Sequence, residues 1–260
     1  MPFNESNGIR YFTFAGFPEE KITHAILTRR GGVSPEPWDS LNVGGTVGDD
    51  RPRVIENRLR SFRALGRDPH SMFDVWQVHS ADVVIANAPH DFRPPEYKAD
   101  AILTDNPDVT LYMRFADCTP VLLYDPVKSA VGLIHAGWLG TVRRVTGAAV
   151  EAMAAAYGSK PADILAGIGP SIGPDHYEIG PDVIARVRET FHDEADDLFE
   201  YRDDCVHFDL WKANRLLLTQ AGVRQVEISR LCTACHPEDW YSHRAQKGKT
   251  GRFGALIALK

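Results

Sequence analysis

The chain contains a succession of short apolar segments with few helices between them, and this pattern limits the fold more than any other feature of the sequence. The segments are rich in β-branched and aromatic residues and are bounded by Gly, Pro or Asp, which is typical of β-strands. They cover residues 23–30, 108–115, 120–126, 130–137, 163–169 and 225–231. Apolar residues spaced by three or four predict helices over 141–157, 52–65, 181–191 and 209–221. Because several strands follow one another directly, we expect an α+β fold of layered β-sheets flanked by helices.

Composition and charge restrict the class of protein. The 260 residues, of which 43% are apolar and 25% are charged, are compatible with one domain over residues 1–260. A net charge of -6 and a pI near 5.9 argue against nucleic acid or an anionic membrane as partner, since both attract basic surfaces. The N-terminal residues do not resemble a signal peptide, and no apolar run approaches the roughly 20 residues that cross a bilayer. We therefore expect a cytoplasmic protein with reduced thiols and small-molecule partners.

Three potential metal ligands end short apolar runs that are predicted to be strands. They are His79 in WQVHS, Cys118 in FADCTPV and His135 in GLIHAGWLGT. Taken alone, each is more often a packing residue, and a free cysteine usually behaves as a small apolar side chain. If the three run ends meet, two imidazoles and one thiolate form a ligand set that suits zinc and leaves a fourth position open. The sequence therefore predicts a catalytic metal site.

The neighbours of these three residues have properties that such a site needs. Asp117 can accept a hydrogen bond from an imidazole and so fix the orientation of the ring. Gly137 and Gly140 lie where a strand pattern changes to a helix pattern, and they allow the backbone to approach a ligand and to direct amide groups at an anion. A tight turn without a ligand explains the same glycines.

These motifs resemble, in order and over nearly the whole length, those of the YfiH family of laccase-domain proteins. The matching blocks are LTRRGGVSPEPWDSLNVGGTVGDD, WQVHS, ADAILTD, FADCTPVLLYD, GLIHAGWLGTV, GIGPSIG and CTACHPEDWYSHRAQKGKTGRFGALIAL. The resemblance implies a fold like that of cytotoxic necrotizing factor and putative cysteine hydrolases. It also implies that His79, Cys118 and His135 bind zinc. We predict that Cys118, His135 and Asp117 are the catalytic residues.

The resemblance further implies an activity on purine nucleosides. We expect phosphorolysis of adenosine, inosine and 5'-methylthioadenosine, with deamination of adenosine as a further activity. Zinc suits deamination because it lowers the pKa of a bound water to near 7, and Asp117 is a candidate to carry protons. Members of the family have also been described as copper-dependent polyphenol oxidases. Copper is less favoured here, because a laccase needs several coppers held by clustered histidines and the ten histidines of this chain are mostly isolated.

Phosphorolysis requires cations and amide donors that hold the phosphate and stabilise the leaving purine. Arg29, Asn42 and Arg244 are the predicted substrate contacts. An exposed salt bridge is the alternative role for each of the two arginines.

One position departs from the family. Leu139 stands where the family motif AGWRGT has an arginine, a side chain able to bind phosphate through two hydrogen bonds. Its absence weakens the prediction that this turn binds phosphate. Arg143 and Arg144 follow one turn later and are candidates to replace it.

Other functions stay open on the sequence alone. Cys118 could be a nucleophile activated by His135, which would make the chain a metal-independent cysteine hydrolase or amidase. A laccase-like polyphenol oxidase and a non-catalytic nucleoside-binding module are further alternatives. Residues 232–236, CTACH, match the attachment motif of c-type haem, which is normally formed outside the cytoplasm. We interpret Cys232 and Cys235 instead as buried thiols, a redox pair or half of a structural zinc site.

Overall fold

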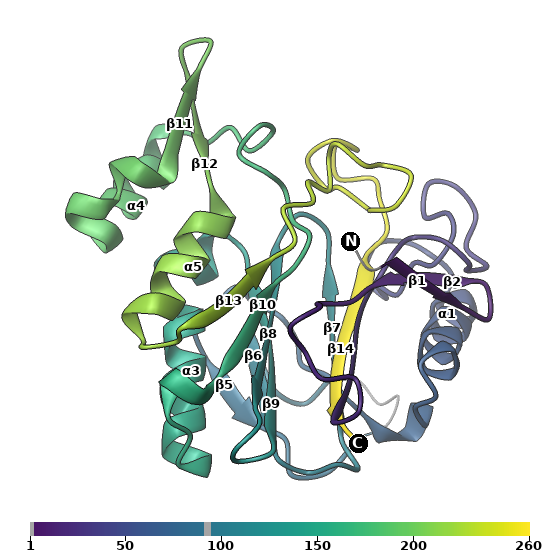
Figure 1. The fold of residues 1–260 in the computed structure, drawn as a ribbon. Coiled ribbons are helices and arrows are strands. Elements are labelled where there is room, and N and C mark those ends of the chain that lie inside the picture. The colour runs from purple at the N-terminus through teal and green to yellow at the C-terminus, as the bar shows by residue number, and fades with distance from the viewer. Residues whose placement is uncertain (1–2, 91–94) are drawn as a thin grey trace.

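Two six-stranded β-sheets, packed face to face, form the centre of the molecule (Figure 1). The computed structural model describes residues 3–90 and 95–260. The first sheet has the strand order β1 (Phe3–Ser6), β2 (Ile9–Phe12), β3 (Ile22–Leu27), β14 (Phe253–Leu259), β7 (Thr110–Phe115) and β4 (Met72–Phe73). The second has the order β13 (Gln225–Ile228), β10 (Leu165–Ile168), β8 (Thr119–Asp125), β9 (Ala130–Ala136), β6 (Ala101–Thr104) and β5 (Val83–Ile85). Both sheets are mainly antiparallel.

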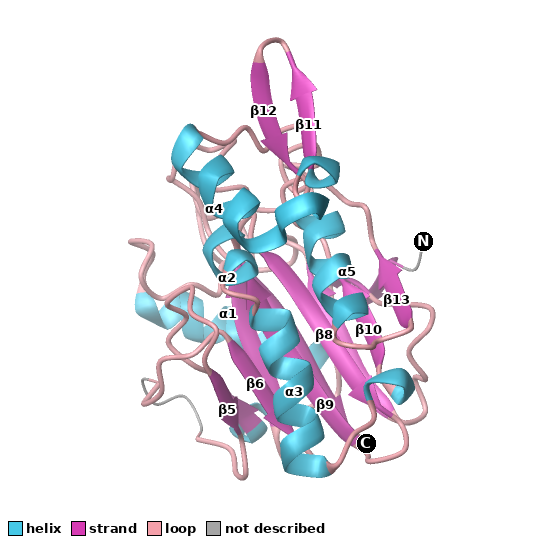
Figure 2. Ribbon diagram, turned by 90° about the vertical axis from the view of Figure 1, so that its left-hand side faces the viewer, coloured by secondary structure: helices cyan, strands magenta, loops and turns pink. Residues whose placement is uncertain are grey.

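Helices cover the outer faces of the two sheets, which gives four layers in all. Helix α1 (Arg51–Ala64) packs against the first sheet through Phe62. The second sheet is covered by α3 (Val145–Tyr157) and α5 (Leu210–Gln220), with α2 (Trp138–Val142) and α4 (Pro181–Phe191) beside them (Figure 2). A hairpin of β11 (Phe199–Arg202) and β12 (Cys205–Phe208) projects from this side of the molecule (Figure 1). No helix in the described ranges is long and apolar enough to span a membrane.

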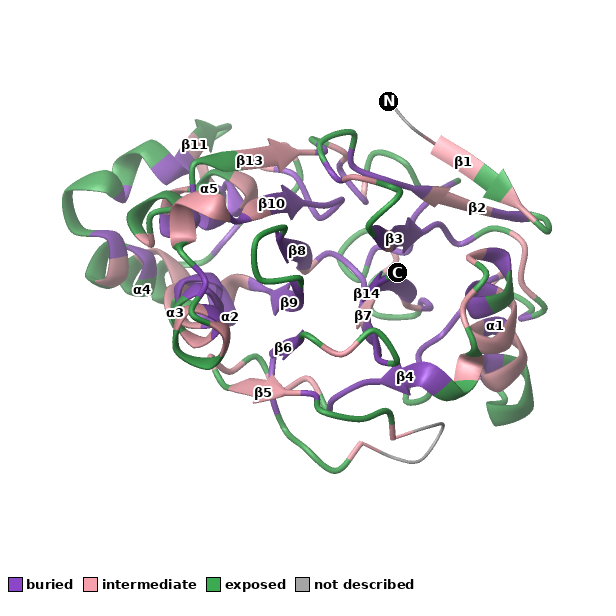
Figure 3. Cartoon of the chain, turned by 60° about the horizontal axis from the view of Figure 1, so that its bottom comes forward, coloured by how far each residue is buried: buried purple, intermediate pink, exposed green. Residues whose placement is uncertain are grey.

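The central strands of the second sheet are buried on both faces, because the first sheet covers one face and helices cover the other. Successive side chains of a strand point to opposite faces, so Leu122 of β8 lies in the core between the sheets while Val121 and Leu123 pack towards α3. All seven residues of β8 and of β9 are buried (Figure 3). Strands of this kind appear in a sequence as continuous apolar runs, which is why these two were predicted correctly.

The predicted α+β class is confirmed, and three of the predicted helices agree with α1, α4 and α5 to within one residue at each end. The helix predicted over 141–157 is wrong at its beginning. Arg144 adopts a left-handed conformation with φ of 64°, so α2 ends at Val142 and α3 begins at Val145. The apolar spacing continues through this break, and the spacing alone therefore gave no sign of it.

The polypeptide passes from the first sheet to the second between β7 and β8. Residues 116–118 form the crossing, and Asp117 adopts a positive φ of 77° there. Strand β9 returns antiparallel to β8, with His135 paired to Pro120. The crossing and the end of β9 are thereby brought together at one edge of the two-sheet core.

Candidate metal centre and cavity

His79, Cys118 and His135 meet where the chain crosses between the sheets. Their ligand atoms all lie within 4.8 Å of one another, and the Cys118 Sγ is 3.8 Å from the His79 Nε2. A tetrahedral zinc with a Zn–S bond of about 2.3 Å and a Zn–N bond of about 2.05 Å places its sulfur and nitrogen ligands roughly 3.6 Å apart. The convergence predicted for these residues is therefore present, with a spacing that fits one zinc ion.

The local structure around His79 differs from the prediction. Its run was expected to be a strand, but only Trp76 forms an isolated bridge, to Lys98, and His79 has a positive φ of 58°. The reason is that the amides of Val78 and Ser80 donate to the Asp100 Oδ2, at 3.1 and 2.6 Å, instead of to a neighbouring strand. The loop therefore curves around one carboxylate.

Asp100 also fixes the second histidine. Its Oδ1 lies 2.8 Å from the His135 Nδ1, and its backbone carbonyl accepts the His135 amide. Because a protonated Nδ1 donates to the carboxylate, the Nε2 of neutral His135 is left free to bind a metal. The role of Asp100 was not predicted from the sequence. An aspartate directly before the apolar run of β6, inside the block ADAILTD, was the signal that could have indicated a buried carboxylate with a specific partner.

The electrostatics of the three residues favour a thiolate. Burial alone would raise the pKa of Cys118, but the charge and hydrogen bonds of His135 and His79 lower it to about 6. Burial opposes protonation of His135, whereas the Cys118 thiolate and Asp100 raise its pKa to about 9. Cys118 is therefore ionised at neutral pH, the state in which sulfur binds a metal or attacks an electrophile.

Asp117 does not make the imidazole contact predicted for it. Its Oδ1 accepts a hydrogen bond from the Thr233 Oγ1 at 2.7 Å, and its Oδ2 accepts one from the Arg244 amide at 2.6 Å. The imidazole contact belongs to Asp100 instead. Asp117 still borders the cavity next to Cys118, so its carboxylate connects this corner of the cavity to the C-terminal loop, residues 229–252.

The metal centre is part of the wall of a cavity of about 650 Å³. This volume lies within the usual range of roughly 300–1,000 Å³ for small-molecule sites. Five arginines line the wall, Arg51, Arg58, Arg114, Arg244 and Arg252, of which Arg58 and Arg114 pair with Asp74. Aromatic side chains line it as well, from Trp76, Trp138 and Tyr177. The cavity thus combines cations that suit an anion with flat surfaces that suit a planar ring.

Of the three predicted substrate contacts, only Arg244 lines this cavity. The guanidinium of Arg29 is used inside the protein, where it donates to the Asp39 carbonyl and carboxylate and to the Pro237 carbonyl and lies over the Tyr241 ring. Asn42 is fully buried. Direct substrate contacts by Arg29 and Asn42 are therefore not supported by the geometry.

Asn42 acts on the cavity indirectly. Its Oδ1 accepts hydrogen bonds from the amides of Gly44 and Arg252, at 3.0 and 2.8 Å, and both of these residues line the cavity wall. Residues far apart in the chain are thereby held side by side. Asn42 is a positioning residue in this arrangement.

The turn that carries Leu139 does not supply a cation to the cavity. Leu139, Arg143 and Arg144 are absent from the described residues that line it. Arg143 donates to the carbonyl of His79 at 2.9 Å, and Arg144 bonds to Gln220 on α5. The arginines of the cavity wall instead come from α1, β7 and the loop of residues 229–252, and of these only Arg244 was predicted from the sequence.

Comparisons with known proteins agree with this fold over nearly the whole chain. A family model described as multi-copper polyphenol oxidoreductase laccase matches residues 23–260. A purine nucleoside phosphorylase of Deinococcus radiodurans is 40% identical over 245 residues, which cover 93% of this chain and 91% of that protein. The purine nucleoside phosphorylase YlmD of Bacillus subtilis is 35% identical over 251 residues, covering 93% and 90%. The crystal structure of the hypothetical protein YfiH of Bacillus licheniformis superposes with a TM-score of 0.92 at 34% identity, covering 100% and 99%.

Proposed function

Because this chain belongs to the laccase-domain family of YfiH and YlmD, we propose that it is a zinc-dependent purine nucleoside phosphorylase. Its proposed substrates are adenosine, inosine and 5'-methylthioadenosine, and it is proposed to deaminate adenosine as well. The observation that carries the proposal is the joining of a His–Cys–His ligand set to an arginine-lined cavity of about 650 Å³. The names of the relatives support the phosphorylase activity.

The ligand set fits zinc. His79, Cys118 and His135 would hold the ion, and Asp100 fixes the tautomer that binding requires. When bound, such a zinc acts as a Lewis acid and lowers the pKa of a coordinated water. A thiolate ligand needs a reduced thiol, which agrees with the expected cytoplasmic location.

Arg252 and Arg244 are the proposed phosphate ligands. Among the described residues Arg252 forms no ion pair, and its Nη1 donates to the carbonyls of Thr250 and Gly251. Burial lowers its pKa, which the negative charges of Cys118 and Asp117 oppose. Arg244 lies over the Tyr177 ring at 5.2 Å and donates to the Glu178 carbonyl. Both cations therefore have nitrogen atoms left for an anion beside the metal centre.

In phosphorolysis, one bond forms and one bond breaks at the ribose anomeric carbon. A phosphate oxygen forms a bond to the ribose anomeric carbon, the glycosidic C–N bond breaks, and its electron pair leaves with the purine, which takes up a proton. Arg252 and Arg244 would hold the phosphate and offset its charge, while Trp138 and Tyr177 offer aromatic surfaces for the purine ring. Burial raises the pKa of Tyr177, so its hydroxyl stays protonated at neutral pH and can donate to the leaving base.

Incubation of the chain with adenosine, with and without phosphate, tests the proposal. Adenine and ribose 1-phosphate that form only with phosphate are the expected products of phosphorolysis, and inosine formed without phosphate reports deamination. If neither adenine nor inosine forms in either condition, the enzymatic proposal is wrong. Binding of adenosine without turnover would identify a nucleoside-binding module instead.

Two arginine variants locate the phosphate site. Arg252→Ala removes charge-assisted hydrogen bonds of about 1.5–3 kcal/mol, which predicts a loss of roughly 10–150-fold in kcat/KM for phosphate. Arg215→Ala on the exposed face of α5 is the matched control, since this side chain does not line the cavity. Equal activity of the two variants would refute the assignment of Arg252.

A cysteine hydrolase is the second candidate, favoured by one specific observation. Cys118, His135 and Asp100 form a nucleophile–base–carboxylate series, with 2.8 Å between the His135 Nδ1 and the Asp100 Oδ1. Metal analysis separates the two functions. One zinc per centre that is lost in Cys118→Ser supports the phosphorylase, whereas a metal-free chain with full amidase activity supports the hydrolase. Laccase activity would require copper and turnover of a polyphenol.

A further inference from the structure

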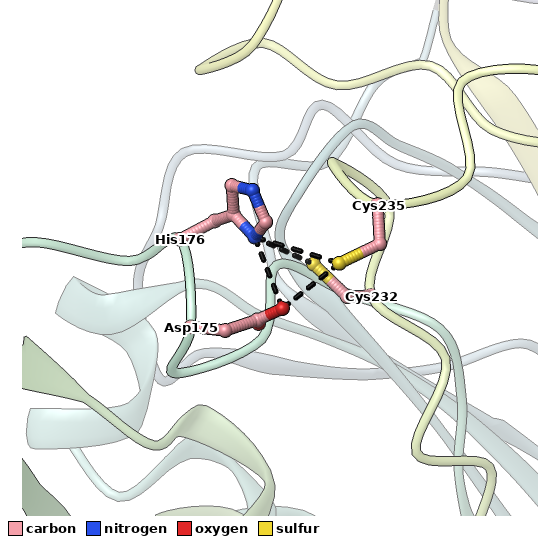
Figure 4. A group of neighbouring side chains, drawn as sticks. All are labelled: Asp175, His176, Cys232 and Cys235. Atoms are coloured by element: carbon pink, nitrogen blue, oxygen red, sulfur yellow. Dashed lines mark hydrogen bonds and ion pairs between the residues drawn. The ribbon is translucent and has the colours of Figure 1, made fainter.

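A second group of metal-binding side chains lies outside the centre described above. Asp175, His176, Cys232 and Cys235 converge from two loops, with one ligand atom from each within 4.8 Å of all the others (Figure 4). Cys232 is buried and Cys235 is exposed, and neither forms a disulfide. The two loops are distant in sequence, so this convergence is a product of the tertiary structure.

The separations of the ligand atoms suit a tetrahedral ion. The His176 Nδ1 lies 3.8 Å from the Cys232 Sγ, 3.5 Å from the Cys235 Sγ and 3.1 Å from the Asp175 Oδ2. Typical zinc bond lengths place nitrogen and sulfur ligands about 3.6 Å apart, and nitrogen and oxygen ligands about 3.4 Å apart. The pair that is closest together is the Cys235 Sγ and the Asp175 Oδ2, at 2.8 Å, because the thiol donates a hydrogen bond to the carboxylate. If a zinc ion binds, the Cys235 thiol loses its proton. The hydrogen bond between the Cys235 Sγ and the Asp175 Oδ2 is then replaced by one bond from each of these atoms to the ion.

The backbone holds the two loops in register without help from an ion. Ser171 and Cys232 form a parallel bridge, the Thr233 amide donates to the Ser171 carbonyl at 3.0 Å, and the Gly173 amide donates to the Cys232 Sγ at 3.2 Å. A Cβ on Gly173 would lie 2.4 Å from the Asp175 Oδ1 and 3.1 Å from the Cys232 Cβ, so only glycine allows this approach. The ligand cluster is therefore pre-formed, which reduces the ordering cost of binding.

We propose that Asp175, His176, Cys232 and Cys235 form a second, structural zinc site. Two thiolates, one imidazole and one carboxylate are a closed set of four protein ligands, unlike the three of the first centre, so no position is left for substrate. The sulfur content favours zinc over magnesium or calcium, which prefer oxygen ligands. On binding, both thiols release their protons to solvent.

The second site is joined to the cavity through the residues next to its ligands. Thr233 follows Cys232 and donates to Asp117, and Tyr177 follows His176 and lies under Arg244. Asp117, Tyr177 and Arg244 all line the cavity. The second zinc would thus clamp the two loops that carry this part of the cavity wall.

Zinc content of the wild-type chain, of three variants in the two ligand clusters and of one control variant tests the second site. The chains are purified in the presence of zinc under nitrogen, dialysed against metal-free buffer and analysed for zinc per polypeptide. We expect two zinc ions in the wild-type chain, one in Cys118→Ser, one in Cys235→Ser and none in the double variant. Cys205→Ser is the matched control, because Cys205 is a half-buried thiol outside both clusters, and it keeps both ions.

The same variants distinguish failure of the first centre from failure of the second site. If Cys118→Ser leaves the zinc content unchanged at one and Cys235→Ser removes it, the first centre fails and the second site stands. If Cys118→Ser contains no zinc, the second site is refuted.

A spectroscopic measurement covers the case in which Cys235→Ser does not fold. Zinc K-edge absorption of the Cys118→Ser chain leaves the second cluster intact and should fit two sulfur ligands at about 2.3 Å and two nitrogen or oxygen ligands at about 2.0–2.1 Å. A fit with nitrogen and oxygen alone, or a peptide map that shows a Cys232–Cys235 disulfide in protein kept under nitrogen, overturns the proposal.

Discussion

Asp100 supports both histidines of the proposed zinc centre, so its replacement by asparagine is the sharpest test of that proposal. One carboxylate oxygen accepts from the His135 Nδ1, and the other accepts from the amides of Val78 and Ser80 on each side of His79. Asparagine has nearly the same shape, but one of its two terminal atoms is an NH₂ group that only donates. It can therefore accept hydrogen bonds from the His135 Nδ1 or from the two amides beside His79, but not from both sides.

The two orientations of the new side chain both weaken zinc binding. If the NH₂ group faces His135, the Nδ1 must become an acceptor, and the proton moves to the Nε2 that should bind the metal. If it faces the loop, the amides of Val78 and Ser80 lose their acceptor, at about 1–3 kcal/mol for each group left unpaired. Loss of such a partner typically lowers metal affinity by roughly 10–100-fold, which corresponds to about 1.4–2.8 kcal/mol. We expect Asp100→Asn to fall in this range.

Competition with a zinc-binding dye measures the zinc affinity of the wild-type chain and of Asp100→Asn. Asp125→Asn is the matched control, because Asp125 is also buried and its Oδ1 accepts two amides, from Val127 and Lys128, but it lies outside both ligand clusters. The control should change stability and leave the zinc affinity of the first centre as it is. Wild-type zinc affinity in Asp100→Asn would refute the role assigned to this carboxylate.

Further predictions concern the backbone beside the centre and the buried charges of the cavity. A Cβ on Gly137 would lie 2.7 Å from the Cys118 Sγ, so Gly137→Ala should lower zinc affinity at least about tenfold in the same dye assay. Gly147→Ala, where a Cβ meets nothing within 4 Å, should instead raise the melting temperature, and equal zinc binding by the two variants would contradict the steric argument. Asp74 pairs with Arg114 and Arg58, so Asp74→Ala should cost about 3–5 kcal/mol of unfolding free energy in urea at pH 7 by leaving buried cations unpaired. Burial opposes ionisation of Asp74, but the hydrogen bond from His90 and the charge of Arg114 hold its pKa below the usual range. Its stabilisation is therefore complete above the unfolded pKa near 4 and is lost as the pH falls through the lower folded value. The difference between the wild-type chain and Asp74→Ala should shrink in urea titrations at pH 3, and a constant difference would exclude this ionisation as the cause.

The sequence by itself determined the elements whose signal is local. Strands β8 and β9 appear as continuous apolar runs because both of their faces are buried, and α4 follows its periodicity from Pro181 to Phe191. The residue types of the candidate ligands His79, Cys118 and His135 were also readable from the sequence, and their binding of zinc stays a prediction. Short, partly exposed strands such as β5 carry no comparable pattern and were not predicted.

Only the tertiary structure decided which side chains meet. Asp100 rather than Asp117 contacts His135, because the carboxylate at the start of β6 is paired across to the end of β9 and the crossing between the sheets turns Asp117 towards Thr233. The four ligands of the second cluster come from two loops joined by a bridge between Ser171 and Cys232. Contacts of this kind depend on the relative positions of segments far apart in the chain, and residue spacing along a sequence does not contain those positions.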